Sequence, residues 1–304
     1  MDDGTQEVTT ISIVREAVKL MDAAEKERKA STFKYYVCIP LPLENKLARS
    51  IEIAHEELFE GLVKAAVEIG KKYGYRYAGE GTIVQDRASE DLVRELAELV
   101  GARGPDAKAL RVRLNTQLVA AQRAWLARLL ESGAPRIRGI LLQLSLDKDA
   151  MFADKLDGLR RLYLDGAVER VLGEQDDLKA SFLLRLIDWA EGRAEKLEVK
   201  DLVDEMKETS ARRARFFARD QFSRFERSMT LASFEAAEAP YVEVFNSNDI
   251  KVRPSHRNAP EGWGRMIYTR AGLEADPRWK DYNCRCGFVP RYELTAEQKT
   301  RLVA

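Results

Sequence analysis

The amino-acid sequence predicts a mainly α protein, in which an N-terminal helical region is followed by a small α+β C-terminal domain. The chain has 304 residues, enough for about two domains. Residues 136–239 contain no proline and are rich in Leu, Ala, Glu, Lys and Arg, as in consecutive helices. After Pro240 only three leucines remain, and short Val, Tyr and Phe runs alternate with turn residues, which indicates small strands. We therefore predict a helical domain over 1–204 and an α+β domain over 205–304.

Apolar residues recur at helical spacing along most of the chain. The clearest case is residues 46–71. Here the intervals between apolar residues alternate between three and four positions over three heptads, as on the buried face of a helix in a bundle. The helices predicted in this way span residues 10–29, 46–71, 88–101, 107–131, 149–172, 176–196 and 199–235. Two aromatic segments favour extended structure instead: a strand or arm at 33–43, and a short strand at 73–77.

Charge and composition exclude several classes of protein. Fifty basic side chains balance fifty acidic ones, so net charge indicates neither a nucleic-acid-binding protein nor one of the membrane surface. No apolar run approaches the ~18–20 residues of a membrane span, and the N-terminus has no signal-peptide pattern. Three cysteines are too few for a disulfide scaffold. We expect a protein made in a reducing cytoplasm, with no membrane partner.

Common catalytic motifs are absent or incomplete. His55 and Glu56 begin like a zinc-protease helix, but Phe59 stands where the second histidine would lie. The sequence has no Walker loop and no Gly-x-Ser-x-Gly nucleophile elbow. We therefore expect His55 to be a boundary histidine on a packed helix, and the protein not to be an enzyme.

The helix predicted over 199–235 is amphipathic. Its apolar arc, which we expect to be buried, consists of Ala218, Phe222, Phe225 and Met229. The opposite side carries Arg212, Arg213, Arg215, Arg219, Arg224 and Arg227. Residues 205–304 hold 18 basic and 14 acidic residues, too mild a surplus to indicate DNA binding by charge alone. Two interpretations remain: a solvated face partly paired with Asp220 and Glu226, or a surface for an acidic partner protein or packaged nucleic acid.

One histidine and two cysteines lie in the Gly- and Pro-rich C-terminal segment: His256, Cys284 and Cys286. These residue types bind zinc, and a fourth ligand would come from Asp249, Asp276, Cys38 or water. However, a single residue between the cysteines restricts both thiolates from reaching one ion. Zinc is therefore the less favoured interpretation.

The favoured interpretation of this segment needs no cofactor. The thiols are buried as small apolar groups, beside an ion-pair and hydrogen-bond network of Asp249, Arg253 and Arg285. Trp263 and Trp279 either belong to the core of this small domain, which is favoured, or anchor a partner surface.

Three segments in this part of the chain form a series with defined spacing. They are residues 212–220 (RRARFFARD), then Asp249-x-x-x-Arg253-Pro254-Ser255-His256, then Asn283-Cys284-Arg285-Cys286 followed by Pro290. Over about residues 200–292, this series resembles the signature of the phage Mu protein F-like family. Members of that family are head morphogenesis, or minor head, proteins of tailed bacteriophages.

The resemblance implies a structural component of the virion, located in the phage head and made in the bacterial host cytoplasm. It implies that the protein binds the portal protein or the major capsid protein at the portal vertex, with packaged DNA as a further contact. Its role would be in head assembly, DNA packaging or ejection, with the helical domain 1–204 contacting the portal or capsid. Two other hypotheses stay open: a DNA-binding module that uses the arginine-rich helix 212–227, and a metal-dependent hydrolase or nuclease. The latter would use His256, Cys284 and Cys286, with Asp249 or Glu243 as base.

Overall fold

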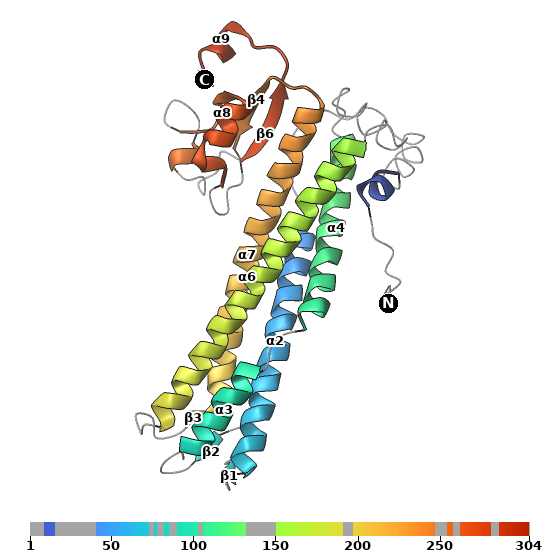
Figure 1. The fold of residues 1–304 in the computed structure, drawn as a ribbon. Coiled ribbons are helices and arrows are strands. Elements are labelled where there is room, and N and C mark those ends of the chain that lie inside the picture. Colours follow the sequence, from blue (N-terminus) through green and yellow to red (C-terminus); the bar gives the residue numbers. More distant parts are fainter. Residues whose placement is uncertain are drawn as a thin grey trace. The chain divides into compact units, whose positions relative to one another are not determined.

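The computed structural model describes residues 9–15, 41–72, 76–77, 82–84, 90–102, 106–131, 150–190, 197–246, 254–257, 262–280 and 286–303. Within these residues the protein is mainly helical, with a small mixed sheet in the C-terminal region (Figure 1). The predicted fold class, mainly α with a small α+β C-terminal part, is confirmed.

Long helices make up most of the described residues. They are α2 (Leu41–Lys72), α3 (Glu90–Ala102), α4 (Ala107–Glu131), α6 (Ala150–Ala190) and α7 (Val199–Ala236). Residues 10–15 form a further short helix, and the rest of the helix predicted over 10–29 lies outside the described residues. Helix α2 carries Pro42 in its first turn, where proline is tolerated because the N–H it lacks would have no intrahelical partner.

The structure differs from the sequence prediction at two helices. Residues 149–172 and 176–196 were expected as separate helices, but α6 continues unbroken for 41 residues. Val171, Glu174 and Gln175 are buried around Gly173, so packing holds the helix continuous across the predicted gap. Residues 41–43, predicted as the end of an extended arm, form the first turn of α2, and 33–40 lie outside the described residues.

The described residues group into two compact units. The first, here called the C-terminal unit, draws on Met1–Glu44, Leu118–Tyr163 and Arg219–Ala304. The second, called the central unit, draws on Asn45–Gln117 and Leu164–Ala218. The boundary predicted between 204 and 205 lies within α7, and the division into domains 1–204 and 205–304 stays a prediction.

The central unit has a helical core, in which the apolar stripe predicted for 46–71 is buried except at Ile69. Its buried members are Leu47, Ile51, Ala54, Leu58, Leu62 and Ala65. The other helices add Leu96, Val100, Leu110, Leu114, Val171, Phe182, Ala214 and Phe217. A small antiparallel sheet completes the unit, formed by β1 (Arg76–Tyr77), β2 (Thr82–Val84) and β3 (Leu197–Glu198). Strand β1 is the described part of the strand predicted at 73–77.

The helices of the C-terminal unit surround a second core. Phe222, Phe225 and Met229 of α7 are at most 1% exposed, as the amphipathic pattern predicts. Trp125 of α4 is fully buried and donates its indole N–H to the hydroxyl of Thr230 over 3.2 Å. The α7 residues predicted to be buried therefore lie in the core.

The C-terminal sheet has the strand order β6-β4-β5-β7. Strand β4 (Tyr241–Phe245) pairs antiparallel with β5 (Ile267–Thr269) and β6 (Gly287–Arg291), whereas β7 (Leu302–Val303) pairs parallel with β5. Between the strands lie the short helices α8 (Arg270–Ala275) and α9 (Ala296–Lys299) and the 3₁₀ turns η1 (Pro254–His256) and η2 (Pro277–Lys280).

Candidate functional site

Two parts of the sequence motif meet in the C-terminal unit. His256 closes the turn η1, and Cys286 stands directly before β6. The imidazole Nδ1 of His256 lies 3.4 Å from the Sγ of Cys286, although thirty residues separate them in the chain. His256 is 3% exposed and Cys286 is 6% exposed. This histidine and this thiol therefore form a buried pair, away from solvent.

Aromatic rings enclose the pair. The rings of His256 and Trp263 lie edge to face, with centroids 5.2 Å apart, and Trp263 meets Phe288 in the same way at 6.0 Å. Edge-to-face contacts of this kind stabilise the fold by about 0.5–1.5 kcal/mol beyond the contribution of buried apolar surface. Trp263 is fully buried, so it belongs to the core of the sheet region and does not anchor a partner surface. Nothing is described of the Trp279 side chain.

Backbone hydrogen bonds fix the turn that carries His256. Arg257 N–H donates to the carbonyl of Pro254 over 3.2 Å, and Trp263 N–H donates to the carbonyl of Ser255 over 3.0 Å. The side chain of Asn246 donates to the carbonyl of His256 over 2.6 Å. The first residue of the turn is a proline, whose fixed φ suits such a turn.

Close packing beside this turn requires a glycine at position 262. A Cβ on Gly262 would lie 2.5 Å from the carbonyl oxygen of Arg257 and 2.8 Å from that of Pro254. These are backbone atoms that cannot move aside without opening the turn. Gly262 therefore lets the chain return to place Trp263 against His256.

The metal interpretation of the motif rests partly on residues that the structure does not describe. Asp249, Arg253, Asn283, Cys284 and Arg285 lie outside the described residues, as does Cys38, so their predicted roles stay predictions. Within the described ranges, no group of three His, Cys, Asp or Glu side chains is placed to hold a metal ion.

Asp276, which the sequence offered as a fourth zinc ligand, is engaged by protein donors. It accepts hydrogen bonds from the Tyr268 hydroxyl over 2.9 Å and from the backbone N–H and side chain of Arg278. Burial, together with the hydrogen bond to Asp276, raises the pKa of Tyr268 to about 12. Burial alone would raise the pKa of Asp276, but the hydrogen bonds from Arg278 outweigh it and lower that pKa.

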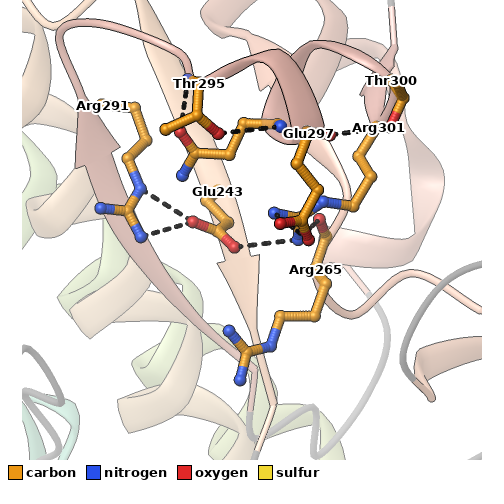
Figure 2. A network of polar contacts seen from close by, with 8 residues as sticks. Glu243, Arg265, Arg291, Thr295, Glu297, Thr300 and Arg301 are labelled. Carbon is orange, nitrogen blue, oxygen red and sulfur yellow. Dashed lines mark hydrogen bonds and ion pairs between the residues drawn. The ribbon is translucent and has the colours of Figure 1, made fainter.

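A second charged cluster, seen in Figure 2, links three segments of the C-terminal unit. The Glu243 side chain, 5% exposed, accepts hydrogen bonds from Arg291 Nε over 2.8 Å and from Arg301 Nη1 over 3.3 Å. The same nitrogen of Arg301 also donates to the carbonyl oxygen of Arg265 over 3.0 Å. Because Arg301 precedes β7, this cluster ties the last described strand to β4 and β6.

Sheet register places Glu243 away from the His256–Cys286 pair. Val244 pairs with Phe288 across β4 and β6, so these two side chains share one face of the sheet. Phe288 contacts Trp263 on that face, and Trp263 contacts His256. Neighbouring strand residues point to opposite faces, so Glu243 points to the other one. This contradicts the role of Glu243 as a base for chemistry at His256.

The arginines predicted as one basic face of α7 have different environments. Ion pairs join Arg212 to Glu208, Arg215 to Glu52, Arg219 to Glu44 and Arg224 to Asp220. Arg227 is only 3% exposed, so it does not belong to a partner or nucleic-acid surface. The Arg224–Asp220 pair agrees with the predicted pairing, but Asp220 is itself buried and so does not belong to a solvated face. Arg213 stays exposed in the central unit.

His55 is more deeply buried than the sequence suggested. It is 1% exposed, and its Nδ1 contacts the hydroxyl of Ser210 on α7. Burial and, to a smaller extent, the nearby positive charge of Arg213 together lower the pKa of His55 to about 4. His55 is therefore a neutral core residue at pH 7 and not a boundary residue.

Comparison with protein-family models, with curated proteins and with solved structures finds no match for this chain. Among the described helices, none combines the length and the apolar character that crossing a membrane requires.

Proposed function

We propose that the chain is a head morphogenesis protein of a tailed bacteriophage: a structural component of the virion that binds the portal vertex or capsid. One observation supports this above the others. Among the described parts of the phage-type motif, His256 of the Pro254–His256 turn and Cys286 form one buried pair. A motif whose histidine and thiol are shielded from substrate serves to build a domain, as expected of a structural protein.

In this proposal the protein acts by binding. The long helices present charged and apolar side chains to solvent, among them Arg213 and Phe216 of α7. Such surfaces suit burial against the subunits of a ring, with the portal protein or the major capsid protein as partner. Packaged DNA is a further contact of the exposed arginines. The protein would be made in the host cytoplasm and reside in the phage head.

The proposal is tested on virions from a host strain that carries the gene within a prophage. After induction, gradient-purified particles are analysed by quantitative mass spectrometry. We expect the chain to be present at a few copies per particle. We also expect it to co-purify with the portal protein when the two are expressed together, while an unrelated helical protein of similar length does not.

A chain absent from purified particles, and bound to neither the portal nor the major capsid protein, would overturn the proposal. Deletion of the gene gives an independent readout. We expect particles without the protein to show fewer DNA-filled heads by electron microscopy, and the wild-type gene supplied in trans to restore them.

A further inference from the structure

The central unit contains a surface cavity of about 700 Å³ between α6 and α7. Three arginines and two carboxylates line it together with a glycine and a phenylalanine: Arg170, Arg212, Arg213, Glu174, Asp177, Gly173 and Phe216. The two helices also meet nearby, where the guanidinium of Arg170 lies 5.6 Å from the ring centre of Phe217. The volume of the cavity falls in the range of ordinary ligand sites, about 300–1,000 Å³.

One oxygen of a buried carboxylate at this cavity has no hydrogen-bond donor among the described residues. Glu174 is 9% exposed, and its Oε1 accepts from Arg170 Nε over 3.3 Å. Its Oε2 is buried and accepts no hydrogen bond from the part of the chain that the structure describes. Buried polar atoms are almost always paired, because an unpaired one costs about 1–3 kcal/mol. Glu174 is thus suited to accept a hydrogen bond from a donor on a bound molecule.

Gly173 leaves the backbone of α6 open beside Glu174. A Cβ at position 173 would have no described atom within 4 Å. Glycine inside a helix lowers stability by about 0.5–1 kcal/mol relative to alanine. No described residue occupies the space that a side chain at position 173 would take. The helix backbone there is free for close approach by another molecule.

The walls of the cavity decide the class of that molecule. Phe216 is 50% exposed and offers an apolar surface. Arg212 and Arg213 supply positive charge, whereas Arg170 is paired with Glu174. Glu174 and Asp177 line the same cavity and would repel the phosphates of a nucleic acid. A peptide suits this mixed lining, because it carries N–H donors, and its acidic and apolar side chains complement arginine and phenylalanine.

We propose that this cavity binds a peptide segment of another protein, one that carries an acidic residue beside an apolar residue. A peptide N–H donates to Glu174, the acidic side chain pairs with Arg212 and Arg213, and the apolar side chain packs on Phe216 over Gly173. The inference rests on the lining of the cavity and not on the proposed phage function. A partner protein from a phage or from any other source would satisfy it.

The test uses the full-length protein and a displayed library of random dodecapeptides. We expect selection to enrich peptides with Asp or Glu next to an apolar residue. Synthesised with a fluorophore, these peptides should bind in anisotropy titrations with micromolar affinity. Gly173→Leu fills the cavity and should weaken binding at least tenfold, and Arg213→Glu should do the same.

Gly158→Leu is the matched control. It makes the same change in the same helix, also at a position where a Cβ meets no described atom within 4 Å, but Gly158 does not line the cavity. It should bind the peptides like the wild type, and circular dichroism should show all variants folded. The inference fails if no peptide is enriched, or if Gly173→Leu and Gly158→Leu bind equally well. A 20-base-pair DNA duplex that binds the wild type and loses affinity in Gly173→Leu would assign the cavity to nucleic acid instead.

Discussion

His256 and Cys286 meet through Nδ1 and Sγ at 3.4 Å, and each is more than nine-tenths buried. They belong to segments far apart in sequence: His256 ends a 3₁₀ turn, and Cys286 directly precedes β6. The ring of Trp263 covers the histidine edge to face. Because the pair is excluded from solvent, its contribution is to the stability of the sheet region.

We expect His256→Ala to lower the free energy of unfolding by about 2–4 kcal/mol, because it leaves a cavity beside Trp263 and removes an aromatic contact. Cys286→Ala removes a smaller group and should cost about 1 kcal/mol. Urea denaturation followed by tryptophan fluorescence measures both. Native mass spectrometry should give the wild-type mass without zinc. A zinc ion held by the wild type and lost in His256→Ala would show that the pair belongs to a metal centre and not to a packed core.

The Glu243 cluster predicts that removing one partner of the ion pair costs more stability than removing both. Glu243→Leu leaves Arg291 and Arg301 facing an apolar side chain, and breaking a buried ion pair costs about 3–5 kcal/mol. The arginine side chains here are 35% and 23% exposed, so water reduces the cost to about 2 kcal/mol. Adding Arg291→Met to Glu243→Leu should recover part of this loss. A double-mutant cycle by urea denaturation measures the coupling, and strictly additive effects would show that the pair does not interact.

The sequence predicted those parts of the fold that depend on local pattern. The stripe from Leu47 to Ala65 on α2 and the buried arc of α7 follow from helical periodicity, which is read within a few turns. The continuity of α6 was missed, because residues around Gly173 are held helical by tertiary packing that a local pattern does not contain. The pairing order of the C-terminal strands could not be predicted, because it depends on contacts between distant segments.

The candidate site was predicted in part. The residue types at Pro254, His256 and Cys286 marked the segment, and burial of Cys286 agrees with the favoured interpretation. The cations that hold Glu243 stand 48 and 58 residues away in the chain, so no spacing rule links them. One signal was present: a carboxylate between Val242 and Val244 in a short apolar strand has to find a cation if it is buried.

The buried His55 predicts a loss of stability in mild acid. Its pKa is lowered to about 4 in the folded protein by burial and by Arg213, while an unfolded histidine titrates near 6.5. The unfolded state therefore binds the proton more readily, so stability is complete above about pH 6.5 and falls as the pH drops towards 4. The full effect of such a shift is on the order of 3 kcal/mol. Urea denaturation at a series of pH values measures it.

His55→Gln is the control for this pH dependence. Glutamine does not titrate and still offers a hydrogen bond to Ser210, so the difference in stability between wild type and variant should shrink from pH 7 to pH 4. Carboxylates such as Asp276, with its lowered pKa, contribute less to stability at lower pH. This loss is the same in both proteins, so it cancels when their stabilities are compared. Parallel pH profiles for the two proteins would assign the acid sensitivity to groups other than His55.

The glycines of α6 at positions 158 and 166 predict a gain of stability on substitution. At both, a Cβ would have no described atom within 4 Å, so alanine meets no clash. Glycine in a helix interior costs about 0.5–1 kcal/mol relative to alanine, because its unfolded backbone has more freedom to lose. Gly158→Ala and Gly166→Ala should each raise the free energy of unfolding by that amount, and the double variant by roughly the sum, because the sites are separated by more than two turns. Thermal and urea denaturation measure the gain, and a loss at either position would mean that this glycine's backbone is held in a conformation that alanine does not share.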